Sequence, residues 1–322
     1  MPQNDHYVSQ TYLKQFASAD GTLVPYYKNM RVVVGKPKQP VSICHEVDGD
    51  MNTYFDDPRI LDKYLQPIET AWATNVDALK SRQLNAEQKY QLAKYVAYLR
   101  VCNPVAKRMS KSRLEAMLRP LSDKVIGEAL NDPTIDQPPL DESTRAQLLE
   151  KFKAGDIRPD VDQEYASARG IEALSGLADR LYCSPWMVSE NHTDIPFLTS
   201  DNPAVVYRHT GSLMETQVYV PLSPKLALLI APGLNKPPPT KNDVAEYTNP
   251  DDQFGIVKRE AVKRFNVCVV KGAEKLVLHA SVEAWIEGLA NKYGSWRMQH
   301  LLQTIPHGNG VLQIHREQAV EA

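Results

Sequence analysis

The segment PAVVYRHTGSLMETQVYVPLSPKLALLI, residues 203–230, contains three short apolar runs with polar or proline-containing stretches between them. The runs are 204–207, 217–220 and 226–230, and they consist mainly of valine, leucine, tyrosine and alanine. Short apolar runs bounded by proline or glycine are typical of β-strands. Because the runs follow one another closely, we expect them to pair as an antiparallel sheet.

Residues 59–182, upstream of these runs, have the apolar spacing of helices. Apolar side chains recur at helical intervals from Ile60 to Leu79, with Pro67 as a kink or boundary. Asn85 with Gln88 three residues later is the pattern of a helix cap. The predicted helices lie near residues 60–79, 85–103, 109–121 and 171–181. The segment 131–143 is rich in proline and acidic residues, so we predict a surface loop there, and a second one over 232–252.

The first 58 residues predict a short helix from Asp5 and a small β layer. That helix would place His6 and Gln10, which are four positions apart, on one side. Two strands are predicted over 23–27 and 31–34.

Strands therefore open and close the chain, which predicts an α+β protein with a helical middle layer packed on an antiparallel sheet formed from N- and C-terminal strands. We expect one domain over residues 1–322, made of the parts 1–58, 59–182 and 183–322. Late helices are expected near 256–269 and after Ser281, and a loose tail after about Gly308.

The composition is that of an ordinary folded protein, with 43% apolar and 24% charged residues among 322. A formal net charge of −2 does not direct the whole molecule toward nucleic acid or a membrane. The polar start of the chain and the absence of any long apolar run predict a cytoplasmic protein with no membrane contact. The four cysteines are widely spaced, so we predict reduced, mostly buried thiols.

Several motifs in a fixed order resemble the DUF 4238 family, a mainly bacterial family of unknown function. The opening run His6-Tyr7-Val8-Ser9-Gln10, followed by Tyr12-Leu13-Lys14 and Phe16, is similar to the start of the family pattern, where proline is common at the position of Ser9. The likeness continues through these residues: Gly21-Thr22-Leu23-Val24, Tyr54, the helix with Glu69, Thr199-Ser200-Asp201-Asn202-Pro203, Pro221-Leu222-Ser223-Pro224 and Asn266. The resemblance implies no settled activity.

Polar residues inside these motifs are the candidate site residues. Asp201 and Asn202 follow an apparent strand, where they could form a turn or bind a metal or substrate. His6 and Gln10 lie in an apolar segment, where they anchor the N-terminus or supply a general base. A divalent metal bound by His6, Glu69 and Asp201 is the corresponding metal-site hypothesis. It requires that His6 and Asp201 share a polar cluster.

Two basic clusters are candidate nucleic-acid contacts, and solvated helix faces are the alternative interpretation. They consist of Lys107, Arg108, Lys111 and Arg113, and of Lys258, Arg259, Lys263 and Arg264. The sequence contains neither a P-loop nor a dinucleotide fingerprint, which argues against NAD- or ATP-dependent chemistry of the usual folds.

Two functional hypotheses follow. The first is a non-catalytic binding or interaction module, in the context of bacterial defence or toxin systems. The second is a metal-assisted hydrolase, in particular a nuclease, whose site would contain His6, Gln10, Glu69, Asp201 and Asn202.

Overall fold

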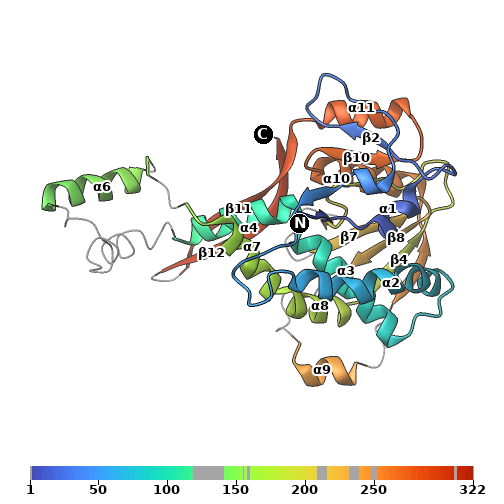
Figure 1. Ribbon diagram of the computed structural model, residues 1–322, viewed down its shortest axis with the longest axis horizontal. Helices are drawn as coiled ribbons and strands as arrows, with labels where there is room; N and C mark the ends of the chain where they lie inside the picture. The colour runs from blue at the N-terminus through green and yellow to red at the C-terminus, as the bar shows by residue number, and fades with distance from the viewer. Residues whose placement is uncertain are drawn as a thin grey trace.

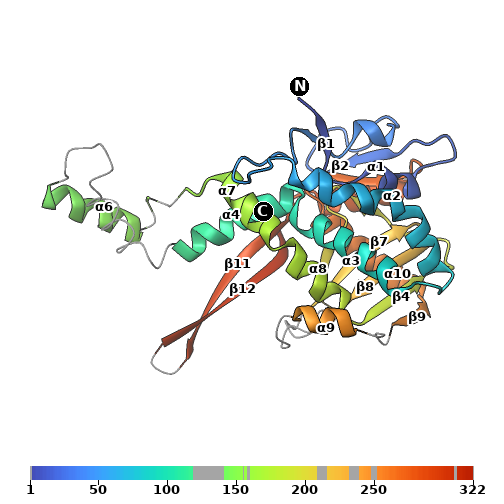
Figure 2. The ribbon, with the colours of Figure 1, turned by 60° about the horizontal axis from the view of Figure 1, so that its bottom comes forward.

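The computed structural model describes residues 2–118, 141–154, 156–157, 160–208, 216–231, 239–247, 252–307 and 310–321. Within these ranges helices are combined with mainly antiparallel sheets, which confirms the predicted α+β class. The body consists of helices packed against sheets, and a long hairpin projects from it (Figures 1 and 2). None of the described helices is long and apolar enough to cross a membrane.

The largest sheet contains five strands in the order β6-β7-β8-β4-β9. Their bounds are β4 (Trp186–Glu190), β6 (Val205–Arg208), β7 (Thr216–Ser223), β8 (Leu226–Ile230) and β9 (Gln253–Ile256). Neighbouring strands are antiparallel except β4 and β9, which are parallel. The three strands predicted over 204–230 are thus confirmed as an antiparallel unit.

A smaller sheet joins strands from both parts of the chain in the order β2-β10-β5, with bounds Val24–Tyr27, Leu276–His279 and Thr199–Ser200. β2 pairs with β10, so a strand near the N-terminus lies beside one near the C-terminus. The strand predicted over 31–34 is wrong, because that segment makes only an isolated bridge between Tyr26 and Val34. Val32 in this segment is 64% exposed, so the apolar run is not buried as a strand would require.

The N-terminal segment begins with a strand. β1 (Asn4–His6) pairs with β3 (His45–Val47), and α1 (Gln10–Leu13) and the 3₁₀ turn η1 (Lys14–Phe16) follow. Ser9 is the N-cap of α1, and its hydroxyl accepts a hydrogen bond from the backbone N–H of Tyr12 at 3.3 Å. The predicted helix start at Asp5 is therefore wrong, and His6 and Gln10 do not share a helix face.

The middle of the chain forms helices α2 (Ile60–Lys80), α3 (Ala86–Val101), α4 (Pro104–Leu118), α6 (Glu142–Ala154), α7 (Gln163–Glu172) and α8 (Leu174–Tyr182). α2 continues through Pro67. The predicted cap of α3 is confirmed, since Asn85 Oδ1 accepts from the backbone N–H of Gln88 at 2.9 Å and Gln88 Oε1 accepts from that of Asn85 at 3.0 Å. The helix predicted near 171–181 corresponds to α8, except that residues 171 and 172 are the end of α7.

Further helices are α9 (Lys241–Glu246), α10 (Arg259–Gly272) and α11 (Ala284–Lys292), and a 3₁₀ turn, η2, covers Pro40–Ser42. Residues 131–140 of the first predicted loop, and 232–238 and 248–251 of the second, lie outside the described residues. In the described parts the loop predictions are wrong where helices form, because α6 begins at Glu142 and Thr240 caps α9.

The core joins the helices to the large sheet. Figure 2 shows α3 and α8 beside β7 and β8, and one buried cluster includes side chains of all four elements. Three aromatic rings pack within it: that of Trp72 lies 4.5 Å from that of Tyr95 and 5.8 Å from that of Tyr12, between ring centroids. The N-terminal motif is therefore part of the core. Of the four free cysteines, Cys44 and Cys102 are buried and the other two are half-buried.

The C-terminus forms a hairpin rather than the predicted loose tail. β11 (Trp296–His307) and β12 (Gly310–Glu321) pair antiparallel from Trp296–Glu321 to His307–Gly310. Figure 2 shows the hairpin leaving the body near α4 and α7. The tail prediction was wrong because residues 313–318, QIHREQ, are almost all polar and so lack the apolar pattern of a buried strand.

Candidate functional site

Three of the sequence motifs, the opening run and those of residues 199–203 and 221–224, contact one another at the hydroxyl group of Tyr12. This hydroxyl donates a hydrogen bond to the carbonyl oxygen of Pro221 at 2.6 Å and lies 2.9 Å from Thr199 Oγ1. All of these groups are buried. The contact joins the opening motif to the motif of residues 199–203 and to that of residues 221–224, and it is a structural contact within the core.

Asp201 anchors the turn between α10 and β10. Its carboxylate accepts hydrogen bonds from the backbone N–H groups of Glu274, Lys275 and Leu276 at 2.9, 2.7 and 3.0 Å. Burial raises the pKa of Asp201 to about 6, although these three hydrogen bonds act in the opposite direction. A carboxylate with its oxygens occupied by three backbone donors is suited to fixing this turn.

Asn202 links two helix ends. Its Nδ2 donates to the carbonyl oxygen of Gly272 at 2.8 Å, and its Oδ1 accepts from Asn103 Nδ2 at 3.0 Å. Asn103 in turn caps α4, because its Oδ1 accepts from the backbone N–H of Ala106 at 2.9 Å. A Cβ atom at Gly272 would lie 2.5 Å from Val205 Cγ1, so glycine is required for this close approach.

The other candidate residues have contacts different from those of Asp201. His6 Nε2 lies 3.2 Å from the carbonyl oxygen of Val41, and burial lowers the pKa of His6. Gln10 begins α1, and Glu69 lies on α2, where burial raises its pKa. No hydrogen bond or ion pair joins these three residues to one another or to Asp201. The described residues contain no group of three or more His, Cys, Asp or Glu that could hold a metal ion.

Tyr7 and Cys44 are among the titratable groups whose pKa is affected by the charge of Asp201. Burial raises the pKa of the Cys44 thiol, and the charge of Asp201 raises it further. Burial likewise raises the pKa of Tyr7, with contributions from Cys44 and Asp201. The thiol is therefore held in its neutral form and is not an activated nucleophile.

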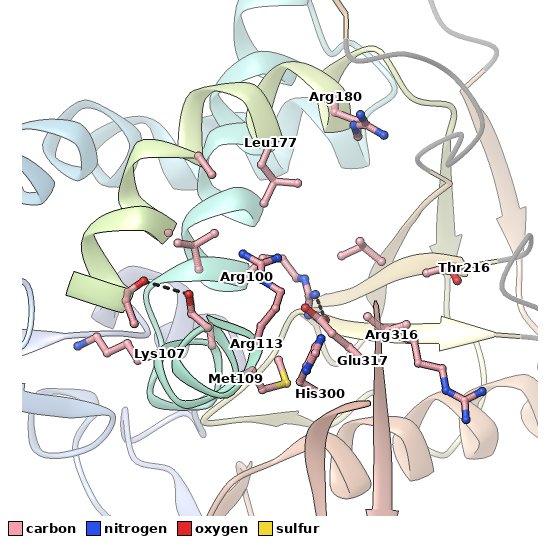
Figure 3. A pocket seen from close by; sticks show the side chains of 18 of the residues that line it. Arg100, Lys107, Met109, Arg113, Leu177, Arg180, Thr216, His300, Arg316 and Glu317 are labelled. Carbon is pink, nitrogen blue, oxygen red and sulfur yellow. Dashed lines mark hydrogen bonds and ion pairs between the residues drawn. The ribbon is translucent and has the colours of Figure 1, made fainter. Parts of the chain in front are cut away.

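A cavity of about 520 Å³ lies between α3, α4, α7, α8, β6, β7 and the hairpin, and we call it the arginine pocket (Figure 3). Its apolar wall includes Val101, Met109, Leu177, Val218 and Ile314. The basic side chains that line it are Arg100, Lys107, Arg113, Arg180, Arg208, His300 and Arg316. Of the described residues that line it, Glu317 is the only acidic one.

Two of these arginines are fixed by the surrounding fold. Arg100 Nη1 donates to the carbonyl oxygen of Ala204 at 3.1 Å, and Nη2 forms an ion pair with Glu317. Arg208 Nε donates to Thr216 Oγ1, and Nη1 donates to the carbonyl oxygen of Glu317, each at 3.0 Å. Both arginines therefore hold β12 against the body and keep their guanidinium groups at the pocket.

Two other arginines are held by no such contact. Within the described part of the chain, the side chains of Arg113 and Arg180 form no hydrogen bond or ion pair. Figure 3 shows Arg113 near Arg100 and Glu317, and Arg180 at the far end of the pocket beyond Leu177. In the same view the guanidinium group of Arg316 points away from Arg100, Arg113 and Glu317. Lys107 Nζ forms an ion pair with Glu46 Oε2 at 3.1 Å.

The electrostatics of the pocket reflect crowded positive charge. Burial lowers the pKa of Arg208; Glu317 counteracts this, and the neighbouring charges of Arg316 and Arg100 lower it further. Burial alone would raise the pKa of Glu317, but Arg100, Arg113 and His300 lower it below its usual value. Glu317 is therefore ionised at neutral pH and is surrounded by more positive charge than it can neutralise.

Most side chains of the two predicted basic clusters form ion pairs with acidic neighbours. In the first, Arg108 pairs with Glu274 at 2.7 Å and Lys111 with Asp160 at 2.5 Å. In the second, Arg259 pairs with Asp194 and Lys263 with Glu260. Lys107 and Arg113 of the first cluster line the arginine pocket, whereas the sequence reasoning missed the pocket residues Arg100, Arg180 and Arg208. These three are single arginines on three separate elements, so no local motif indicated them.

Asp201 and Asn202 contribute to this pocket indirectly. The motif that contains them leads into Ala204, whose carbonyl oxygen orients Arg100, and Asn202 binds Asn103 at the start of α4. Neither residue lines the pocket. Asp201 and Asn202 thus support the pocket from outside its wall.

A second cavity of about 540 Å³ shares Val101, Lys107 and Ser167 with the first. The acidic residues that line it are Glu46, Asp48, Asp50, Asp162 and Glu164. Asp50 is its most buried carboxyl group, at 4% exposure. Burial raises the pKa of Asp50 to about 7, while Lys107 acts to lower it.

Comparison with known proteins gives one family. The family model described as "Protein of unknown function (DUF4238)" matches residues 4–283. No curated protein and no solved structure matches the chain. Because the family match spans most of the chain and includes the motifs joined at Tyr12, this protein belongs to the DUF4238 family of proteins of unknown function.

Proposed function

We propose that this protein is a binding module for a small ligand that carries a phosphate group, and that the ligand binds in the arginine pocket. The observation that carries the proposal is that Arg100, Arg113, Arg180 and Arg208 all line one cavity, and that Glu317 is the only acidic residue among the described residues that line it. These arginines come from α3, α4, α8 and β6. Their gathering is therefore a product of the fold and not of a local charged run.

The surplus of positive charge argues for an anionic ligand. Like charges in a partly buried site repel one another, and an opposite charge relieves that repulsion. Glu317 forms an ion pair with Arg100 alone, and Arg113 and Arg180 are left without a hydrogen-bonded partner in the described part of the chain. A bound anion would supply the missing charge and acceptor atoms.

A phosphate group suits this arrangement better than a carboxylate. A guanidinium group binds phosphate through two parallel hydrogen bonds, and a terminal phosphate offers three acceptor oxygens and up to two negative charges. A carboxylate has only two oxygens and one charge. Several arginines around one space therefore favour phosphate.

The volume and the apolar wall restrict the rest of the ligand. A cavity of about 520 Å³ lies in the range of small-molecule sites, roughly 300–1,000 Å³. Met109, Leu177 and Val218 would contact an apolar or aromatic part of the ligand. A nucleotide, which combines a planar base with phosphate, has this combination of properties.

Thermal unfolding in the presence of a panel of probes tests the proposal. The probes are inorganic phosphate, AMP, ATP, a short single-stranded RNA and acetate, all at matched ionic strength. A ligand that binds the folded state raises the melting temperature by mass action, so the phosphate compounds should raise it and acetate should not. Excluded phosphate also stabilises proteins without binding, and Arg113→Gln separates the two effects because it removes only the site.

The proposal fails if every phosphate compound raises the melting temperature of the wild-type protein by no more than it raises that of Arg113→Gln. Stabilisation by RNA with none by AMP or ATP would instead favour the predicted nucleic-acid contact. Of the two hypotheses drawn from the sequence, the pocket supports the binding module. The hydrolase, the bacterial defence or toxin context and the cytoplasmic location stay predictions.

A further inference from the structure

Among the described residues that line the arginine pocket, the one acidic residue comes from the C-terminal hairpin. Glu317 lies on β12, and the family match ends at residue 283, before β11 begins. Arg100, Arg113, Arg180 and Arg208 all lie within the matched region. These four arginines thus belong to the family domain, and the carboxylate of Glu317 belongs to the segment that follows.

We propose that Glu317 occupies the position of an anionic ligand group and competes with the ligand of the arginine pocket for Arg100. This inference rests on the proposed phosphate-binding function. The carboxylate of Glu317 pairs with Arg100 Nη2, which is the kind of contact that a phosphate oxygen would make. Figure 3 shows Glu317 among Arg100, Arg113 and His300, in the most basic part of the pocket.

The hairpin is held in place by contacts that do not depend on the Glu317 side chain. At its base, Lys28 Nζ donates to the carbonyl oxygen of Trp296 at 2.5 Å, and Arg108 Nη2 donates to that of Met298 at 3.0 Å. Arg208 binds the backbone carbonyl of Glu317. The side chain of Glu317 can therefore leave Arg100 by rotation about its own bonds while β12 stays docked.

Competition has a measurable consequence. When a binding-competent state is only a fraction of the population, the apparent affinity is reduced by that fraction. In the wild-type protein the ligand must displace Glu317 from Arg100 and must enter beside its negative charge. Removal of that charge frees Arg100 and should increase the affinity for phosphate.

The test is titration calorimetry of the full chain with inorganic phosphate and with AMP, comparing wild type, Glu317→Gln and Glu321→Gln. Glu321 lies on the same strand, and its carboxylate accepts a hydrogen bond from the Ser295 hydroxyl. It does not line the pocket, so Glu321→Gln is the matched control for the loss of one charge. Glu317→Gln should bind at least about tenfold more tightly, and Glu321→Gln should bind as the wild type does. Glu317→Asp, which keeps the charge and shortens its reach, should give a smaller gain and serves as the second variant if Glu317→Gln does not fold.

Equal affinity of wild type and Glu317→Gln would overturn the competition and leave the proposed function standing. Weaker binding by Glu317→Gln would also overturn it, because Glu317 would then help to bind the ligand. Absence of binding by every variant would reject the proposed function itself, and with it this inference. The three results are distinct.

Discussion

The hydroxyl group of Tyr12 lies 2.9 Å from that of Thr199, 187 positions further along the chain. Tyr12 also donates a hydrogen bond to the carbonyl oxygen of Pro221. Through this one buried group the opening motif is fixed to the two motifs of the C-terminal half. Since all of the atoms involved are buried, the loss of the hydroxyl would leave acceptors without a donor.

Replacement of Tyr12 by phenylalanine should lower the free energy of unfolding by about 1–3 kcal/mol, the cost of leaving a buried hydrogen-bonding group unsatisfied. Urea denaturation measures this change. Tyr165→Phe is the control, because Tyr165 is 42% exposed and its hydroxyl forms no hydrogen bond in the described residues. Equal stability of Tyr12→Phe and the control would show that the contact contributes nothing.

Much of the fold could be predicted because its signals are local. The runs over 204–230 alternate with turn residues, and Asn85 with Gln88 is a cap that acts over one helical turn. The errors arose where tertiary contacts decide the structure. Residues 4–6 become a strand because residues 45–47 pair with them. Likewise, the mostly polar residues 313–318 are part of a strand because they pair with β11.

Asp201→Asn tests whether Asp201 is a structural residue. Three backbone N–H groups bind the two carboxylate oxygens, and an asparagine amide would offer one oxygen and face the remaining donors with an N–H₂ group. At pH 8 the variant should lose about 1–3 kcal/mol of stability. Asp77→Asn, on the exposed face of α2, should change stability little.

A stable, fully folded Asp201→Asn protein would contradict this role. That result would return Asp201 to the list of candidate site residues suggested by the sequence.

Asp50 should make stability depend on pH. Its pKa is raised to about 7 by burial, above the value of about 3.9 in an unfolded chain. Between these two values the folded state binds more protons than the unfolded state, so stability falls as the pH rises through this window. Asp50→Asn removes the titration, so its melting temperature relative to that of the wild type should be higher at pH 8 than at pH 5.

The control for this pH series is Asp56→Asn, an exposed substitution a few residues away. A difference between Asp50→Asn and the wild type that stays constant from pH 5 to pH 8 would be evidence against a raised pKa.

The candidate site was less predictable than the fold. Asp201 and Asn202 attracted attention because they are polar residues in a distinctive motif, yet their partners are backbone groups and Asn103. The residues that gather at a cavity are arginines on α3, α4, α8 and β6, and nothing in the sequence places these elements together. A site assembled from isolated residues of several elements becomes visible only in three dimensions.

Titration calorimetry with AMP tests the central claim most directly, comparing wild type, Arg113→Gln/Arg180→Gln and Arg259→Gln/Arg264→Gln at fixed ionic strength. The first pair removes two pocket arginines that make no hydrogen bond or ion pair in the described residues, so the fold should be kept. The second pair removes the same charge from the exposed N-terminal half of α10. We predict saturable binding to wild type and to the α10 variant, and affinity at least about tenfold weaker for the pocket variant, a loss of about 1.4 kcal/mol. Equal affinity for all three proteins, or no saturable binding to the wild type, would contradict the account.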